Sequence, residues 1–369
     1  MGGGIGLGEN LYVLAGVDIN KGNLFAEMIK ERVSAAWPEM GQEIGGFAGG
    51  GPIPQGATSV KGSADGAGTV ALLSALAGKY TIGHNAVAMG AVDTYVAGAR
   101  PRYLLDTLNV GRLVPDVHIK IIDSVIEACQ KAGCRLIGGE TAEVPDMHRY
   151  DWVFNLDVAV IGFPDPELIY VPVHPGQKVY GWMSYGPGSN GFSIFRKVHK
   201  LKIEEGFWFH IRQAFGLANK NLIRVKERLT APLNELYGHS LAEDLLIPTP
   251  IRIQEMDFQR KRGVRFAADA HITGGGMPGN IPRVLPDNCM VIIDRSTWNR
   301  PTIFRYTQEI GRIEQAEMDK VFNQGIMVAS IVDPNGPLPD DSSVVEIGAV
   351  EKRRGNEAQV QFTGKHRDF

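Results

Sequence analysis

The sequence predicts a chain of two α/β (α+β) domains, and its length and its patterning both support this. With 369 residues, the chain is about twice as long as a typical single domain, so each half can bury its own core. Strand-like and helix-like patterns alternate on both sides of residues 164–176, a segment with four prolines. We therefore expect an N-terminal domain at 1–170, a second domain at 171–350, and a frayed polar tail at 351–369.

The elements of the first half follow from the spacing of apolar residues. Helical spacing predicts helices at residues 21–36, 69–78, 84–97 and 117–132. Extended apolar runs predict strands at residues 58–60, 103–108, 134–137 and 152–163. In the second half, residues 178–183 read as a strand, followed by a glycine-rich loop that opens a helix carrying Ile194, Phe195 and Val198.

The composition excludes several classes of function. A net charge of −3 gives no electrostatic reason to expect a nucleic acid or an anionic membrane as partner. No apolar stretch approaches 18 residues, and no signal peptide is visible. The three cysteines are too few for a disulfide framework and lack metal-ligand spacing, so we expect reduced thiols and a cytoplasmic location.

Two glycine-flanked acidic clusters carry most of the chemical information. They are Ser63–Thr69 (SADGAGT) and Gly138–Glu143 (GGETAE). Glycine lets backbone N–H groups approach a phosphate closely, and carboxylates can hold the Mg²⁺ that accompanies it. Neither cluster fits the P-loop or the dinucleotide-binding spacing, so phosphate binding would use a less common architecture.

These clusters and six further blocks, in this order, make the chain resemble the aminoimidazole ribonucleotide synthetase family, also called phosphoribosylformylglycinamidine cyclo-ligase. The likeness spans residues 15–332, nearly the whole chain. The matching blocks are Ala15–Ile19, Asp65–Thr69, Gly138–Glu143, Ser189–Gly191, Leu246–Thr249, His271–Gly276, Asn280–Pro286 and Phe322–Gly325.

The resemblance implies the two-domain ATP-dependent synthetase fold. In that fold the N-terminal sheet forms a barrel-like dimer interface, and the C-terminal domain is an α/β sandwich. It further implies a homodimer that binds ATP and Mg²⁺ partly between subunits. The implied reaction is the ATP-dependent ring closure of formylglycinamidine ribonucleotide to aminoimidazole ribonucleotide, ADP and phosphate, in purine biosynthesis.

Site residues follow from the resemblance together with the demands of phosphoryl transfer, which needs positioning and neutralised oxygens. Asp65 and Asn190 are the candidate catalytic residues. The candidate Mg²⁺ ligands are Asp65, Asp93 and Glu140. The candidate ATP and phosphate contacts are Gly66, Gly68, Thr69, Asp93, Gly138, Gly139, Glu140 and Thr141. The candidate substrate contacts are Ser189, Asn190, Gly191, His271 and Thr273.

Each of these residues also has a plain structural interpretation. A carboxylate can be a cap or a surface charge, a glycine can make a tight turn, and the segment 189–191 can cap a helix. A lone histidine beside an apolar run, such as His271, is more often structural. The glycine-rich N-terminal loops are expected to form a lid over the nucleotide.

Four positions depart from the family pattern. They are Val70 in place of a lysine, Val92 in place of an asparagine, Gly188 in place of a histidine and Pro250 in place of an arginine. Lys61, Lys79 or Arg100 could supply the lost charge. Two alternatives stay open: a paralogue of the selenophosphate synthetase or thiamine-monophosphate kinase type with another acceptor, or a catalytically dead regulatory dimer.

Overall fold

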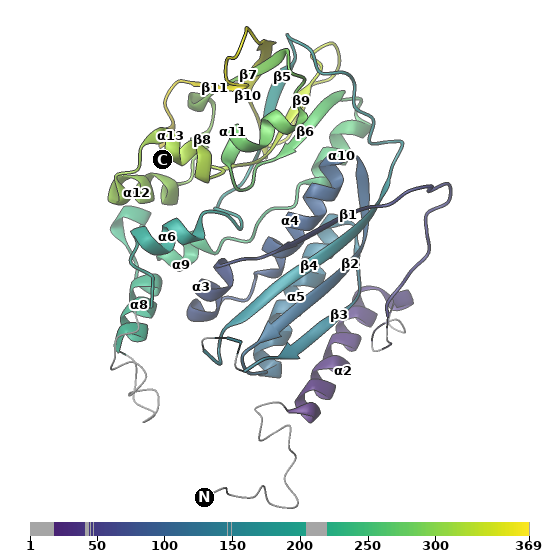
Figure 1. Cartoon of the computed structure of the whole chain (residues 1–369), viewed down its shortest axis with the longest axis vertical. Coiled ribbons are helices and arrows are strands. Elements are labelled where there is room, and N and C mark those ends of the chain that lie inside the picture. Colours follow the sequence, from purple (N-terminus) through teal and green to yellow (C-terminus); the bar gives the residue numbers. More distant parts are fainter. Residues whose placement is uncertain are drawn as a thin grey trace, which may run out of the picture. The chain divides into compact units, whose positions relative to one another are not determined.

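The computed structural model describes residues 18–40, 44, 46, 48–145, 147–148, 150–203 and 220–368 (Figure 1). The chain divides into two compact units. Unit 1 ends at Pro164, and unit 2 begins at Asp165 and also includes Val96–Gly98. Residues 15–17 of the first matched block and the glycine-rich start of the chain lie outside the described residues, whereas the second glycine-rich loop is described at 44, 46 and 48–52.

Unit 1 is built on a mixed four-stranded sheet. Its strands are β1 (Lys61–Gly66), β2 (Ala99–Val110), β3 (Arg135–Glu143) and β4 (Phe154–Pro164). The spatial order is β1-β4-β2-β3. Strand β4 runs antiparallel to β1 and to β2, whereas β2 and β3 are parallel, so β1 and β3 form the two edges.

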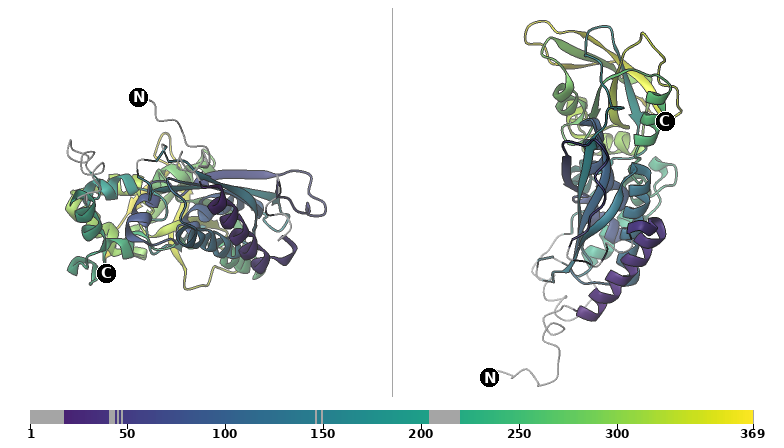
Figure 2. Two further views of the ribbon diagram at one scale, coloured as in Figure 1. Left: turned by 90° about the horizontal axis from the view of Figure 1, so that it is seen from below. Right: turned by 90° about the vertical axis from the view of Figure 1, so that its right-hand side faces the viewer.

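Helices cover one face of this sheet (Figure 2). They are α2 (Ile19–Ala36), α3 (Val70–Ala77), α4 (Gly83–Val96) and α5 (Pro115–Ala132), with a short 3₁₀ turn η1 (Pro38–Met40) after α2. Helix α4 lies close to β4 at Gly90, where an added Cβ would stand 2.8 Å from Val160 Cγ2. Along β4, buried residues alternate with half-buried ones, so the opposite face of the sheet is partly open.

Unit 2 contains a six-stranded sheet in the order β11-β7-β10-β5-β9-β6. Its strands are β5 (Lys178–Met183), β6 (Phe266–His271), β7 (Cys289–Asp294), β9 (Ile326–Val332), β10 (Val344–Lys352) and β11 (Val360–Thr363). All pairings are antiparallel except β11 with β7. A second, two-stranded sheet joins β8 (Asn299–Arg300) to β12 (Arg367–Asp368).

The helices of unit 2 are short. They are α6 (Phe192–Val198), α8 (Lys220–Thr230), α9 (Leu241–Leu245), α10 (Ile253–Lys261), α11 (Gly276–Asn280), α12 (Thr302–Gly311) and α13 (Gln315–Val321). Three 3₁₀ turns accompany them: η2 (Asn234–Leu236), η3 (Ile281–Val284) and η4 (Arg295–Thr297). No helix in the described part of either unit is long and apolar enough to cross a membrane.

The predicted mixture of helices and strands in two α/β units is confirmed, with three corrections. The first strand begins at Lys61, after the predicted 58–60, and it contains Asp65 instead of ending before it. Strand β3 likewise continues through the second acidic cluster. The second cluster and residues 63–66 of the first are therefore extended backbone paired within a sheet, whereas Gly68 and Thr69 lie in the turn before α3.

The expectation of a frayed tail is wrong for residues 360–368. Strand β11 pairs with β7, and Val360 is buried against the core of unit 2, with Phe362 packed beside it. The alternating apolar residues of this segment bury enough surface to hold it on the sheet. Because Val360 and Phe362 lie among polar residues, their alternating apolar pattern was not recognised as a strand in the sequence.

Candidate functional site

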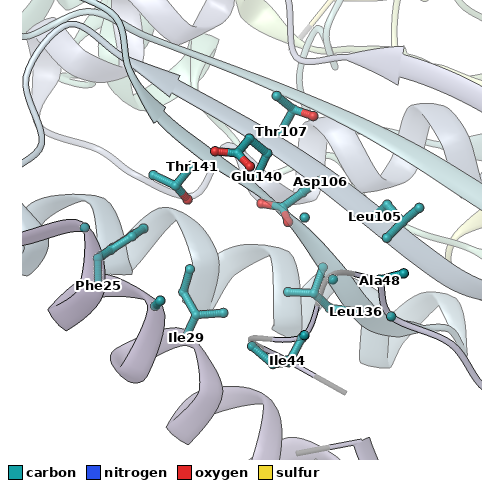
Figure 3. Close-up of a pocket in the computed structure, with 16 residues that line it drawn as sticks. Phe25, Ile29, Ile44, Ala48, Leu105, Asp106, Thr107, Leu136, Glu140 and Thr141 are labelled. Atoms are coloured by element: carbon teal, nitrogen blue, oxygen red, sulfur yellow. The ribbon is translucent and has the colours of Figure 1, made fainter. Parts of the chain in front are cut away.

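Unit 1 contains a pocket of about 630 Å³ between α2, the segment around residues 44–49, and strands β2 and β3 (Figure 3). One side of the pocket is apolar and the other is polar. The apolar side chains are Phe25, Ile29, Ile44 and Leu136, and the polar ones are Asp106, Thr107, Glu140 and Thr141. This volume lies within the range of small-molecule sites.

Glycine residues allow the backbone segments that line this pocket to lie very close to neighbouring groups. An added Cβ on Gly139 would lie 2.0 Å from the Asp106 carboxyl oxygen Oδ1. At Gly49 it would lie 1.7 Å from the Ile137 carbonyl oxygen. Gly138 and Gly139 are strand residues, so the tight-turn interpretation does not apply to them. Their role is close approach of neighbouring groups, as the phosphate hypothesis also requires.

Helix α2 is held beside the pocket by polar contacts at its start. The Asp18 side chain caps the helix by accepting from the backbone N–H groups of Asn20 and Lys21. The Glu143 carboxylate accepts from Asp18 N at 2.9 Å and from Leu113 N at 2.8 Å. Glu143, the last residue of the second acidic cluster, therefore links the start of α2 to β3 and to the segment at Leu113.

Asp106 is a pocket residue that the sequence analysis did not select. It lies in the middle of β2, is 7% exposed, and contacts Gly139 on the neighbouring strand. Burial raises the pKa of Asp106 to about 7, and the charge of Glu140 adds to this. A single carboxylate inside the apolar run Tyr103–Leu108 was the signal that could have identified it.

The first acidic cluster lies on the other edge of the sheet. Asp65 Oδ1 accepts from Gly66 N at 2.7 Å. An added Cβ on Gly66 would stand 2.0 Å from Asp157 Oδ1, so glycine is needed for the close approach of β4. Burial raises the pKa of Asp157, assisted by the charge of Asp65 and opposed by a hydrogen bond from Asn155. Asp157 is a second carboxylate that the sequence analysis missed.

The remaining ATP candidates of this cluster lie around the start of α3. Gly68 has a φ of 66°, a left-handed conformation that favours glycine. Thr69 is the N-cap residue of α3, but its side chain makes no capping hydrogen bond. Its hydroxyl is therefore not used to cap the helix, unlike the side chain of Asp18.

The three candidate metal ligands are not brought together within one chain. Asp65 lies on edge strand β1, Glu140 on edge strand β3, and Asp93 on α4. Asp65 is in register with Val158 and Asp106, whereas Glu140 is in register with Thr107, so Asp65 and Glu140 point to opposite faces. Across the described ranges, no three His, Cys, Asp or Glu side chains are placed to share an ion.

A second candidate site lies in unit 2, at the loop before α6. Gly188 and Gly191 have φ values of 69° and 78°, which glycine adopts without strain. An added Cβ on Gly188 would stand 3.8 Å from Thr249 Oγ1 and from Asn323 Nδ2. On Gly274 it would stand 3.7 Å from Asn190 Oδ1. The loop before α6 therefore lies close to three other sequence blocks.

Two hydroxyl groups at this second site are buried without a partner among the described residues. They are Ser189 Oγ and Thr249 Oγ1, and Thr249 is only 5% exposed. Asn323, by contrast, is engaged, since its Nδ2 donates to the Gly186 carbonyl at 3.2 Å. A buried hydroxyl without a partner is costly, so these two groups are candidates for contact with a ligand. Thr249 and Asn323 were in matched blocks but were not selected as site residues.

The block 271–280 is arranged by Asn280. Its Nδ2 donates to the carbonyls of Gly276 at 2.8 Å and Gly274 at 3.2 Å, and Thr273 Oγ1 donates to its Oδ1 at 3.5 Å. His271 is the last residue of β6 and is buried. Thr273 is thus placed next to the glycine turn, while His271 belongs to the sheet.

The departures from the family pattern have different structural settings. Val70 and Val92 are 2% and 1% exposed and belong to the core on α3 and α4. Gly188 occupies a left-handed turn beside Thr249. The three possible replacement cations are Lys61, at the start of β1, Lys79, after α3, and Arg100, in β2. None of these cations is among the described residues that line the unit 1 pocket.

Comparison with protein families gives two matches that together span most of the chain. The family described as AIR synthase related protein, N-terminal domain, matches residues 55–163. Its companion, AIR synthase related protein, C-terminal domain, matches residues 174–361.

Curated relatives match over nearly their full length. The chain is 35% identical to the phosphoribosylformylglycinamidine cyclo-ligase of Synechococcus sp. (strain CC9605), covering 91% of this chain and 90% of the relative. It is 38% identical to the protein of that name from Citrifermentans bemidjiense, covering 87% of each. For Syntrophus aciditrophicus, the identity is 32% over 96% of this chain and 99% of the relative.

Solved structures with much lower identity share the fold. Thiamine-monophosphate kinase from Stenotrophomonas maltophilia superposes with a TM-score of 0.58 at 14% identity, covering 92% of this chain and 97% of that one. The hydrogenase maturation protein HypE of E. coli gives a TM-score of 0.56 at 16% identity, covering 92% and 93%. At such identities, these matches show the fold alone.

Proposed function

The chain belongs to the AIR synthase family, and from this premise we propose that it closes the imidazole ring of aminoimidazole ribonucleotide. The substrates would be formylglycinamidine ribonucleotide and ATP, and the other products ADP and phosphate. The observation that carries the proposal is the near full-length match to relatives named cyclo-ligase, a ligase of purine biosynthesis. Both units, and therefore both candidate sites, fall within that match.

The proposed reaction has two steps. The formyl oxygen of the substrate attacks the γ-phosphorus of ATP, and the bond to the leaving ADP breaks. A substrate nitrogen then attacks the activated carbon, the carbon–oxygen bond to phosphate breaks, and the nitrogen loses a proton. Such chemistry needs positioning and charge stabilisation more than covalent catalysis by the protein.

Unit 1 would bind the ATP. Gly66, Gly68 and Thr69 at one sheet edge, and Gly138, Gly139 and Thr141 at the other, offer backbone that phosphate can approach. Asp65, Asp93 and Glu140 are hard oxygen donors of the kind that Mg²⁺ prefers. When bound, Mg²⁺ would neutralise the phosphate oxygens during transfer.

The positions of Asp65 and Glu140 support a homodimer. They lie on opposite edges and opposite faces of one sheet, so a second copy could complete a site that one chain leaves divided. The half-buried face of the sheet carries Leu105, Ala159 and Ile161, an apolar surface suited to the barrel-like interface of the family.

Unit 2 would bind the ribonucleotide. Ser189, Asn190, Gly191 and Thr273 lie around glycine turns whose backbone can approach a phosphate or formyl group. Thr249 adds a buried hydroxyl without a partner among the described residues. His271, as a sheet residue, would act by holding this block in place.

We also propose a cytoplasmic location. Cys129, Cys134 and Cys289 are all unpaired and buried, as expected for a protein of a reducing compartment.

The test is ADP release by the purified protein with MgATP, with and without formylglycinamidine ribonucleotide. ADP that depends on this substrate, together with aminoimidazole ribonucleotide as product, supports the cyclo-ligase. ADP release that is independent of it would indicate another acceptor. Binding of ATP without any release would indicate a regulatory protein that has lost catalysis.

A further inference from the structure

Gln324 has an unusual backbone conformation for a buried residue. Its φ is 46°, in the left-handed region that glycine adopts without strain, and it is only 4% exposed. The other three described residues with a positive φ besides glycines are exposed and lie at the ends of helices or 3₁₀ turns: Lys200, Tyr237 and Arg312. Such strain persists only where the surrounding structure enforces it, and it is concentrated at functional sites.

The side chain of Gln324 is held in a buried polar network. Its Nε2 donates to Asp319 Oδ1 at 2.7 Å. Its Oε1 accepts from Gln315 Nε2 at 3.2 Å and from Arg300 Nη1 at 3.3 Å. The Gln324 carbonyl also accepts from Trp298 Nε1 at 2.9 Å. Side chains from α13, from β8 and from the residue before β8 therefore fix this one position.

The turn 322–325 supports the start of the loop before α6. The Gly325 carbonyl accepts from Ser184 N at 2.8 Å. Asn323 Nδ2 donates to the Gly186 carbonyl at 3.2 Å. The amide of Asn323 is itself oriented, because its Oδ1 accepts from Gly325 N at 3.0 Å. Two hydrogen bonds thus join the turn to the loop.

The same turn also supports the far end of this loop. An added Cβ on Gly191 would stand 2.3 Å from Phe322 Cε1, so the backbone of the loop lies directly on the Phe322 ring. Between the two ends, an added Cβ on Gly188 would stand 3.8 Å from Asn323 Nδ2. The conformation of the turn therefore determines the position of the loop along its whole length.

We propose that Gln324 is a positioning residue for the second substrate. Its hydrogen bonds hold the turn 322–325 in one conformation, and the turn fixes the loop 186–191. A loop that is already ordered loses less conformational freedom when a ligand binds, so the ligand binds more tightly. The inference rests on the proposed function in taking this loop as the ribonucleotide site, and it assigns Gln324 a role in that site.

The first test is the variant Gln324→Met, which keeps the length of the side chain and removes its amide. Asp319, Gln315 and Arg300 each keep another hydrogen bond, so the variant should fold. We expect KM for the ribonucleotide to rise about tenfold, while KM for ATP stays unchanged. Unchanged KM for the ribonucleotide in the folded variant would overturn the proposal.

The second measurement follows the loop directly by amide hydrogen exchange and mass spectrometry, without any substrate. The Ser184 amide donates to the Gly325 carbonyl, so it reports the contact between loop and turn. In Gln324→Met, exchange across residues 184–191 should become about tenfold faster, the effect of losing roughly one hydrogen bond. Exchange at the wild-type rate would show that Gln324 does not position the loop.

Gln308→Met is the matched control. Gln308 belongs to the same network, since it accepts from Arg300 at 2.7 Å and donates to Gln315 at 3.2 Å, but it lies on α12 and outside the turn. This variant should leave both KM values and the exchange of the loop unchanged. Equal effects of the two substitutions would reduce Gln324 to a part of the core.

The two measurements allow the two proposals to fail separately. A wild-type protein that forms no aminoimidazole ribonucleotide would refute the proposed function, and hydrogen exchange would still decide whether Gln324 positions the loop. A protein that forms the product, but whose loop exchange and ribonucleotide KM do not respond to Gln324→Met, would keep the proposed function and lose this inference.

Discussion

The two units use their sheets differently. In unit 1, helices cover one face, and the residues of the other face are half-buried. In unit 2, strands β6 and β9 are buried along their whole length. Residues on the half-open face of unit 1 are within reach of a ligand, whereas the buried strands β6 and β9 leave binding to the loops at their ends.

The chemistry of the two candidate sites follows this difference. Unit 1 presents carboxylates, including Asp65, Asp106 and Glu140, which suit a metal ion and a nucleotide. Unit 2 presents neutral hydroxyl and amide groups around glycine turns, including Ser189 and Thr249. Changes in unit 1 should therefore act on ATP, and changes in unit 2 on the second substrate.

The largest expected effect is the loss of turnover in Asp65→Asn. Removing one charge that acts on a transferring phosphoryl group commonly lowers kcat by about 10³-fold, or about 4 kcal/mol. The fold should survive, because Asp65 is half-buried and asparagine keeps an oxygen that can accept from Gly66 N. The measurements are ADP release and a thermal melt.

Asp123→Asn is the matched control for Asp65→Asn. Asp123 is an exposed carboxylate in unit 1 that pairs with Arg32 at 3.2 Å. This control should keep full turnover, since surface ion pairs contribute little. Normal turnover in Asp65→Asn would remove Asp65 from the mechanism.

The next largest expected effect is on the free energy of unfolding. It tests position 70, where this chain has valine in place of the family's lysine. Because Val70 is 2% exposed at the start of α3, Val70→Lys would bury an ammonium in the core. A positive charge at a helix N-terminus is also unfavourable. We expect a loss of about 3 kcal/mol in the free energy of unfolding, measured with denaturant, and no gain in turnover.

Val70→Met provides the control, because it lengthens the side chain without adding charge. Its cost should stay below about 1.5 kcal/mol. If Val70→Lys were as stable as the wild type and more active, the site would have kept room for the family's lysine, and the core assignment of this position would be wrong.

Sequence predicted local features well and non-local ones poorly. Helix α2 follows from apolar spacing and the capping residue Asp18, both within a few positions of each other. Asp106 owes its setting to Gly139 on a paired strand, and Thr249 owes its setting to Gly188. Strand β11 is stabilised by pairing with the distant β7. Such pairings are set by the fold and leave no local signal.

The third effect is a pH dependence in unit 2. His199 is 5% exposed, and burial lowers its pKa to about 4. A histidine with a lowered folded-state pKa stabilises the protein above about pH 6.5, and this stability is lost as pH falls toward 4. Between pH 7 and pH 5, His199 alone should account for a loss of about 2 kcal/mol.

The variant His199→Gln isolates this contribution. Glutamine can keep the hydrogen bond that joins His199 Nε2 to Thr307 Oγ1 at 2.8 Å, but it does not titrate. Unfolding free energies at pH 7 and pH 5 are compared in the two proteins, so any constant cost of the substitution cancels. His118 and His366, whose pKa values burial also lowers, contribute equally to both proteins. Identical pH slopes would show that His199 binds protons equally in the folded and unfolded chains, so burial would not lower its pKa.

The smallest effect gives the sharpest distinction between the units. Thr249→Val removes a buried hydroxyl that has no partner in the described structure and nearly keeps its shape. Because no internal hydrogen bond is lost, the free energy of unfolding should stay the same or rise slightly. If the hydroxyl binds the ribonucleotide, KM for that substrate should rise about tenfold while KM for ATP stays unchanged.

Thr307→Val is the contrasting control. The Thr307 hydroxyl donates to the Ile303 carbonyl at 2.7 Å and also bonds the His199 ring. Its removal should therefore lower the free energy of unfolding without affecting either KM. A rise in KM for ATP in Thr249→Val would contradict the division of labour between the units, and unchanged kinetics would leave the Thr249 hydroxyl without a ligand.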